Sequence, residues 1–533
     1  MTEKQEVTKE ENFLNERDGY KKYKDRNFAE KLWYLRDNVT VEPLLAGLII
    51  PSVISRFAMG NFNLDKACRV NLAYDDVICD ALVKKNSDNY TMYEKEVQKL
   101  ISSIDIWKSI LSTALPCIII MFLGAWSDRT GKRKLCILLP IFGEFVTSLN
   151  NIVNVYFFYE IPVQVTVFLE TFFPAITGGW VTMFLGVFSY ISDITSEKSR
   201  TFRVGLVSFC MTAGLPIGLG ISGILLKKMG YYGIFSMTSC LFIVVLMYGC
   251  FCLREPDQFL QDNGFPPIER ITSKETSFFD VSHVVETIGV AVRKRAPNRR
   301  VKVILTLVAV FILYGPSMAE HHIVYLFVRN RLNWDMVKYG FYAGYSIVLH
   351  SFGAMFSIAV LSKKLQIDDA ILCLISVLSK FVGAIWTAFV TTDIEMYLIP
   401  CIELLGGVTT TSLRSIISKI VDKQETAKVN SLFSLTETLA SLLFQPLYAW
   451  LYMNTLSVLP GAVFLTTAAL IVPAVVILII FITQGRKERR EARKKALEAE
   501  EKKDAEAEKA AEKPYLPQNP PNITQDIKEK TKM

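Results

Sequence analysis

The sequence lacks the motifs of an enzyme. It holds only four histidines in 533 residues, and no nucleophile–base pair or set of metal ligands stands at a spacing that catalysis would use. Its net charge of +7 lies mostly in segments predicted to be cytoplasmic, so it gives no reason to expect a nucleic-acid partner. These absences argue against catalysis, a bound metal and a cofactor. They leave transport, or sensing and scaffolding, as the classes of function to consider.

What the sequence does contain is long apolar runs. Hydrophobic residues make up 51% of the chain, and its mean hydropathy is +0.29. A helix of about 20 apolar residues crosses the hydrocarbon layer of a bilayer. We therefore expect an all-α membrane protein with twelve transmembrane helices. The expected spans are 42–61, 105–124, 135–158, 164–190, 203–226, 232–252, 302–328, 337–361, 369–391, 394–417, 429–452 and 460–483.

The short loops between these spans predict the orientation. Basic residues gather in alternate loops, such as 125–134 and 362–368, whereas 159–163 and 453–459 have none. Because cytoplasmic loops are enriched in Lys and Arg, both termini are predicted to lie inside. The expected parts are a cytoplasmic tail 1–41, a six-helix bundle 42–252 with an extracellular loop 62–104, a cytoplasmic linker 253–300, a second six-helix bundle 301–484 and a charged cytoplasmic tail 485–533.

The loop 62–104 carries two features of an extracellular segment. Asn89-Tyr-Thr is an acceptor pattern for N-glycosylation. Cys68 and Cys79 lie in the same loop and would meet an oxidising compartment. We favour a disulfide between them, with two free thiols as the alternative.

The loop after the second span carries the most specific motif, Gly124-Ala-Trp-Ser-Asp128-Arg129-Thr-Gly131-Lys-Arg133. Gly124 would let two helices approach closely, and Gly131 would permit a tight turn. Asp128 could lie against the positive N-terminus of a helix, and Arg129 would help to hold the loop in the cytoplasm. The pattern resembles the signature loop of the major facilitator superfamily. That resemblance implies a carrier that works by alternating access, with these residues in conformational gating.

Ionisable residues within spans are costly and mark candidate functional sites. Arg56 lies in the first span, which would line the substrate path, and Glu320 and His321 could take up and release protons. Arg414 in the tenth span would suit an anionic substrate, since guanidinium binds carboxylates well. Lys380 is in the ninth span, which would face lipid, so we do not expect a site there. Further ionisable residues within the spans are Glu144, Glu170, His322, His350, Glu403 and Glu437.

Three segments resemble solute carrier family 46: Thr40-Val-Glu-Pro43, Asn330-Arg-Leu-Asn-Trp334 and the run from Leu413 through Ser434. The resemblance implies proton-coupled symport of organic anions. Within it, Asp128 matches the family's essential loop aspartate, and Arg414 matches an arginine tied to proton and substrate binding. A glutamate of the family's fifth span falls at about Ser208 here, so one coupling carboxylate is missing from its usual place.

The sequence therefore favours a carrier of a small organic anion, driven by a proton gradient and embedded in the bilayer through many spans. The alternative is a sensor or scaffold that keeps the fold and transports nothing. The plasma membrane is the expected location and the lysosomal membrane the alternative, because neither tail holds a clear sorting signal.

Overall fold

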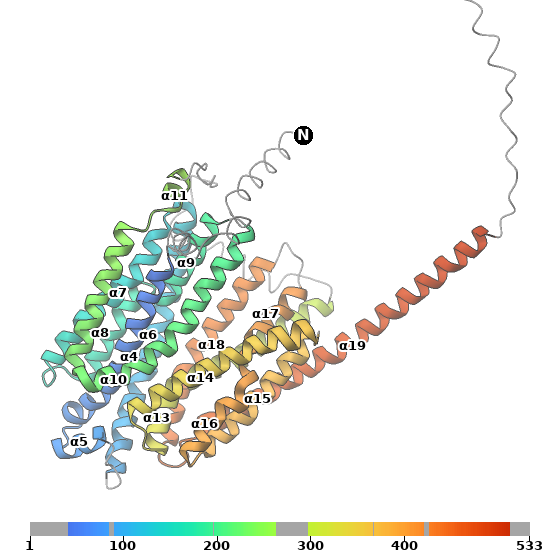
Figure 1. The fold of residues 1–533 in the computed structure, drawn as a ribbon. Helices are drawn as coiled ribbons and strands as arrows, with labels where there is room; N and C mark the ends of the chain where they lie inside the picture. Colours follow the sequence, from blue (N-terminus) through green and yellow to red (C-terminus); the bar gives the residue numbers. More distant parts are fainter. Residues whose placement is uncertain are drawn as a thin grey trace, which may run out of the picture. The chain divides into compact units, whose positions relative to one another are not determined.

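The computed structural model describes residues 41–84, 90–195, 197–262, 297–365, 367–420 and 426–511, and all of its regular structure is helical (Figure 1). The chain forms two compact units, Met1–Leu478 and Ile479–Met533. The last helix, α19, begins in the first unit and continues into the second.

The helices of the first half are α4 (Glu42–Lys66), η1 (Ala67–Asn71), α5 (Asp76–Lys84), α6 (Thr91–Thr130), α7 (Arg133–Tyr156), α8 (Val163–Ile176), α9 (Gly179–Ile194), α10 (Glu197–Phe251) and α11 (Pro256–Asp262). Those of the second half are α13 (Pro297–Arg331), α14 (Met336–Phe356), η2 (Ser357–Lys364), α15 (Asp369–Phe389), α16 (Asp393–Ile402), η3 (Glu403–Val408), α17 (Thr409–Ile420), α18 (Thr426–Thr455) and α19 (Ala462–Ala511).

All twelve predicted spans fall on helical segments, which confirms the all-α membrane class. Within the described residues, ten stretches are long and apolar enough to cross a membrane. One of them, Leu206–Phe251, carries two predicted spans, and Gly230 divides them with a φ of 68°. A glycine is needed at that angle because other residues rarely adopt it. The eleventh predicted span lies in α18, which is not among the ten.

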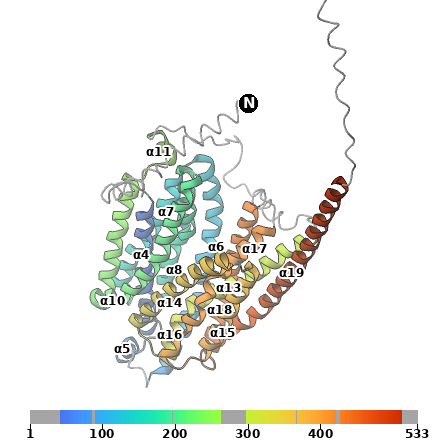
Figure 2. The ribbon, with the colours of Figure 1, turned by 45° about the vertical axis from the view of Figure 1, so that its right-hand side comes forward.

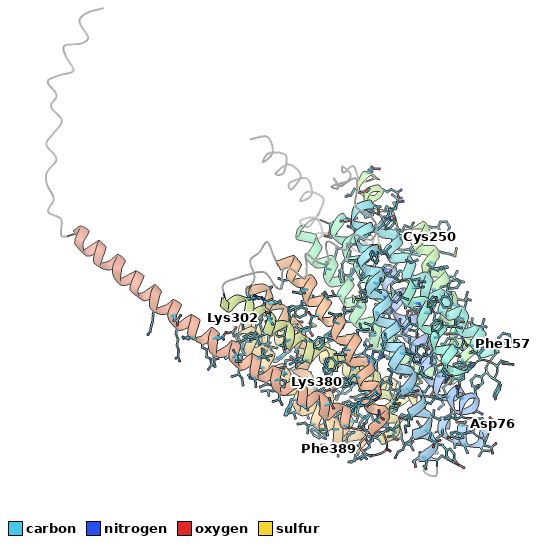
Figure 3. The ribbon with its side chains drawn as sticks, turned by 180° about the vertical axis from the view of Figure 1, so that it is seen from behind. Asp76, Phe157, Cys250, Lys302, Lys380 and Phe389 are labelled. Atoms are coloured by element: carbon cyan, nitrogen blue, oxygen red, sulfur yellow. A yellow bond between two sulfur atoms is a disulfide. The ribbon has the colours of Figure 1, made fainter. Side chains whose placement is uncertain are left out.

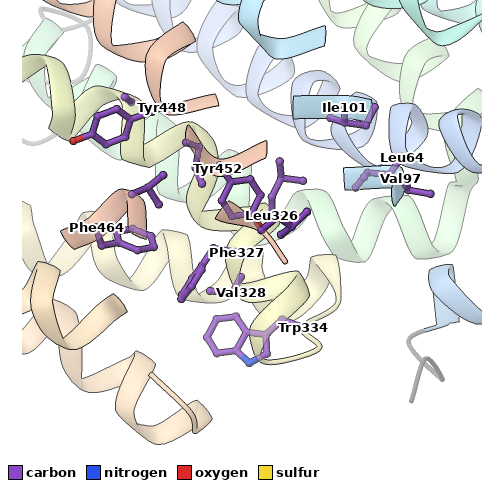
Figure 4. Close-up of a cluster of buried hydrophobic side chains, with 14 of the residues drawn as sticks. Leu64, Val97, Ile101, Leu326, Phe327, Val328, Trp334, Tyr448, Tyr452 and Phe464 are labelled. Carbon is purple, nitrogen blue, oxygen red and sulfur yellow. The ribbon is translucent and has the colours of Figure 1, made fainter. Parts of the chain in front are cut away.

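The segment 62–104 differs from the extracellular loop that we expected, because most of it is helical. α4 and η1 continue to Asn71, and α6 begins at Thr91, well before its apolar run. The extra turns are polar on one side, but their apolar side chains enter a buried cluster with residues of the second half (Figure 4). Hydropathy detects only the part of a helix that lies in lipid, so it misses such extensions. Cys68 and Cys79 form a disulfide here, and Asn89 lies outside the described residues.

The two halves pack through two helix pairs. α6 lies along α18, and α10 lies along α14 (Figure 2). The second pair is close: a Cβ added at Gly223 would lie 2.8 Å from Val337 Cα, and one at Gly340 would lie 2.8 Å from Leu219 O. Glycines at these positions let the backbones approach without a side chain between them.

Candidate functional site

A buried charge cluster occupies the second half. Lys380 Nζ on α15 lies 2.9 Å from Glu320 Oε2 on α13 and 3.3 Å from Glu403 Oε2 on η3. His350 Nε2 on α14 lies 3.6 Å from the same Glu403 oxygen. Side chains from four helical elements thus form a cluster of two carboxylates, one lysine and one imidazole. Lys380 of this cluster is labelled in Figure 3. Within a membrane, such groups mark a functional site.

The local sequence around Glu403 explains how it reaches this position. The predicted tenth span breaks at η3, and serines of α15 satisfy carbonyls of the broken helix: Ser379 Oγ donates to Ile402 O at 2.5 Å, and Ser376 Oγ donates to Gly406 O at 3.0 Å. Opposite the Glu403 carboxylate stands Gly383, where an added Cβ would lie 2.1 Å from Glu403 Oε1. The absence of a side chain at Gly383 leaves room for the carboxylate.

Arg414 on α17 belongs to a separate group. Its Nη2 lies 2.5 Å from Glu437 Oε2 and donates to Ser434 Oγ at 3.2 Å. The guanidinium carbon lies 4.7 Å from the centroid of the Phe433 ring, a cation–π distance. Arg414 is therefore already paired with an acid.

Arg56 and Lys108 form ion pairs in the first half. Arg56 Nη2 on α4 lies 2.6 Å from Glu144 Oε1 on α7, and its guanidinium carbon is 5.0 Å from the centroid of a Trp180 ring. Lys108 Nζ on α6 lies 3.5 Å from Glu170 Oε1 on α8. His322 of α13 is within electrostatic range of both Lys108 and Arg56, so this side of α13 is turned toward the first half.

The ion pairs of Arg56, Lys108, Lys380 and Arg414 share one arrangement: the base is the more exposed partner, and the acid is the more buried one. The Arg56 side chain is 53% exposed against 4% for Glu144, and Arg414 is 42% exposed against 12% for Glu437. The pairs of Lys108 and Lys380 follow the same order. Each acid lies on the buried side of its base. The N–H groups on the exposed side of the base remain available to a ligand. Such an arrangement offers hydrogen-bond donors and positive charge to an anion.

The structure does not gather the four predicted substrate and coupling residues into one place. Arg56 lies in the first half, Arg414 lies beside Glu437, and Glu320 lies in the Lys380 cluster, with His321 exposed next to it. Our expectation for Lys380 was wrong, since this side chain pairs with two buried carboxylates and is not left to the lipid. The sequence signal was present: Lys380 and Glu403 are both ionisable residues within predicted spans.

Sequence reasoning also missed a polar network that joins the halves at the end that carries the disulfide. Arg329 Nε of α13 lies 2.5 Å from Glu94 Oε1 of α6, and Arg329 Nη2 donates to Leu82 O of α5 at 3.2 Å. Gln98 Nε2 donates to Glu94 Oε1 at 2.9 Å, and Tyr452 OH of α18 donates to Gln98 Oε1 at 2.9 Å. Glu94 and Gln98 were hidden in the segment interpreted as a polar loop.

Comparison with known proteins identifies the family. Residues 102–445 match the model of the Major Facilitator Superfamily. The chain belongs to this superfamily. Its membership agrees with the predicted fold and with a role in transport across a membrane, and it sets the chain apart from enzymes.

Three relatives of this chain have names that refer to transport. The lysosomal proton-coupled steroid conjugate and bile acid symporter SLC46A3 of Gallus gallus is 27% identical, with 72% of this chain and 80% of the relative covered. The proton-coupled folate transporter of Rattus norvegicus is 25% identical, with 72% and 80% covered. A probable peptidoglycan muropeptide transporter SLC46 of Drosophila melanogaster is 21% identical, with 79% and 81% covered. The likeness to solute carrier family 46 is thus found over most of the chain.

Solved structures of the superfamily show the same fold. The human organic anion transporter MFSD10 (TETRAN) has a TM-score of 0.54 at 13% identity, with 82% of this chain and 98% of that chain covered. A peptide transporter POT has a TM-score of 0.53 at 14% identity, with 83% and 95% covered. At such low identity these likenesses concern the fold alone.

In the superfamily's signature loop, the backbone follows the predicted turn. Gly131 has a φ of 69° and ends α6, and a Cβ at Gly124 would lie 3.0 Å from Leu185 Cδ2 of α9. The side chains of Asp128 and Arg129 lie outside the described part of the chain. The N-terminus of α7 does hold an acid, Glu255, whose Oε2 accepts from the backbone N–H of Arg133 at 3.0 Å.

Proposed function

We propose that this chain is a secondary active carrier that moves a small organic anion together with protons by alternating access. One observation carries the proposal: in the ion pairs of Arg56, Lys108, Lys380 and Arg414, the base is the more exposed partner and the acid is buried behind it. A cation entering between the halves would meet like charges, whereas an anion would meet positively charged N–H donors.

Arg56 and Arg414 are the proposed anion contacts, one from each half. Each guanidinium is held by a carboxylate and lies against an aromatic ring, so its orientation is fixed before a ligand arrives. A fixed donor loses little conformational entropy on binding. The relatives support the same chemistry, since the bile acids and folate in their names carry carboxylates.

Transport in purified form tests the proposal against the sensor or scaffold reading. The protein is reconstituted into liposomes, and uptake of taurocholate, estrone sulfate and folate is measured with and without an inward proton gradient. We expect acid-stimulated uptake of at least one of these anions, and a loss of about tenfold or more in Arg56→Gln and Arg414→Gln. Arg490→Gln, an exposed position on the tail, is the matched control and should transport normally.

Uptake of none of the three anions by intact reconstituted protein would favour the sensor or scaffold. Equal uptake by the wild type and both arginine variants would remove these residues from the substrate path. Fractionation of cells with markers of the plasma membrane and the lysosome tests the proposed plasma-membrane location against the lysosomal one.

A further inference from the structure

We propose that the coupling proton of the transport cycle binds between His350 and Glu403. This inference rests on the proposed function, because it assigns the place of the proton in that cycle. It differs from the sequence prediction, which gave proton coupling to Glu320 and His321. The nitrogen of the His350 ring that carries hydrogen determines where the added proton can bind.

The hydrogen bond of His350 to its own helix fixes the tautomer. His350 Nδ1 lies 2.8 Å from the carbonyl oxygen of Ser346, and a carbonyl oxygen can only accept. Nδ1 therefore carries a hydrogen, and Nε2 of the neutral ring has a lone pair. That nitrogen faces Glu403 Oε2 at 3.6 Å, so two acceptors oppose each other. A proton added to Nε2 lets the two atoms approach from 3.6 Å and form an N–H···O bond.

The charges of the cluster favour the same event. With both carboxylates ionised and Lys380 protonated, the cluster of Glu320, Glu403 and Lys380 carries one net negative charge while His350 is neutral. Both carboxylates are almost fully buried, with exposed fractions of 3% and 8%. An uncompensated charge in the membrane interior is costly. A single proton makes the cluster neutral, by forming a bond to Nε2 and breaking none within the protein.

Glu320 and His321 of α13 are the other groups of the cluster that could take up this proton. Glu320 Oε2 lies 2.9 Å from Lys380 Nζ, and His321 is exposed. Cys401 of α16 and Pro216 of α10 contact α14 five and six residues before His350: Cys401 Sγ lies 3.1 Å from Tyr345 OH, and a Cβ added at Gly344 would lie 3.3 Å from Pro216 O. Glu403 is thus the acceptor that faces Nε2. It opens the segment Glu403–Ile420 that also carries Arg414, which connects the proton to the proposed anion contact.

Two assays on reconstituted full-length protein separate this inference from the proposed function. The first measures exchange of labelled for unlabelled anion at equal pH, which needs substrate binding and reorientation but no net proton movement. The second measures acid stimulation of net uptake. The probes are taurocholate, estrone sulfate and folate. We expect His350→Gln and Glu403→Gln to keep exchange and to lose about tenfold or more of the acid stimulation.

The matched control is Glu395→Gln, an exposed carboxylate in the capping box of α16 that glutamine can replace as acceptor. It should keep both activities. Retained acid stimulation in His350→Gln or Glu403→Gln, or an equal loss in the control, overturns the proton site. Should His350→Gln fail to reach the membrane, Glu403→Gln decides alone. Absence of exchange by the wild type with all three anions overturns the proposed function instead.

Discussion

Arg329 and Glu94 form a buried, two-bonded ion pair across the two halves of the protein. Arg329 Nε lies 2.5 Å from Glu94 Oε1, and Arg329 Nη2 lies 3.2 Å from Glu94 Oε2. Their side chains are 4% and 5% exposed. Because Gln98 and Tyr452 extend the pair to α18, the network ties α6 to two helices of the second half. It holds the halves together at the end predicted to face outside.

Reversing one charge of this pair should open that end. Glu94→Arg or Arg329→Glu would bury two like charges, and breaking a buried pair costs about 3–5 kcal/mol. We expect faster modification of Cys117, a half-buried free cysteine of α6, the helix that packs along α18, by an impermeant maleimide added from the predicted outside. The double variant Glu94→Arg/Arg329→Glu should restore the slow rate, with Cys117→Ala as the blank. Unchanged labelling in both single variants would contradict a gating role.

Gly383→Ala should disrupt the Lys380 cluster. The new Cβ would fall 2.1 Å from Glu403 Oε1, so the carboxylate must leave its place beside Lys380. Overpacking of this kind costs about 1–3 kcal/mol. We expect acid-stimulated anion uptake to fall about tenfold while the protein remains in the membrane. Gly220→Ala, where nothing lies within 4 Å of the added Cβ, is the control and should behave as the wild type. Normal uptake by Gly383→Ala would show that Glu403 need not stay beside Lys380.

Loss of the disulfide should loosen α5. Cys68 and Cys79 are 11 residues apart, and a bond that closes so short a loop contributes about 3 kcal/mol in the chain-entropy model. Since α5 supplies the Leu82 carbonyl to Arg329, we expect Cys68→Ser/Cys79→Ser to have a lower melting temperature. Thiol alkylation with and without reductant, followed by mass spectrometry, checks the bond itself. Two thiols alkylated without reductant would favour the free-thiol alternative.

Asp128→Ala should abolish transport without removing the protein from the membrane. The motif match gives Asp128 a role in the state that is closed to the inside, so its loss changes the balance of states more than the fold. Uptake and surface biotinylation of the same cells measure the two effects separately. Full uptake by Asp128→Ala would refute the assigned role.

Asn89→Gln tests the predicted side of the segment between η1 and α6. If this segment faces the lumen or the outside, the wild type carries a glycan at Asn89 and the variant should migrate faster on a gel. Treatment of the wild type with an N-glycosidase should give the same shift. Equal mobility of the two proteins would argue against an outside position or against occupancy.

The membrane class, the order of the spans and the list of candidate ionisable residues were accessible from the sequence. Hydrophobicity is a property of consecutive residues, so a run such as 369–391 can be recognised without knowing its neighbours. The turn at Gly131 could also be predicted from the sequence, and this glycine has the backbone angle that the turn requires. The polar extensions of the helices could not be predicted from the sequence, because polar residues such as Glu94 and Gln98 do not raise the hydropathy of a segment.

Which ionisable residues meet was decided by the tertiary structure. Lys380 pairs with Glu320 and Glu403, and Arg329 with Glu94, across large separations in sequence. A span predicts the depth of a side chain but not the direction in which it points, because the rotation of each helix depends on its packing against all the others. The sequence therefore determined where charge is buried in this protein, and the packing of the helices determined which charges face one another.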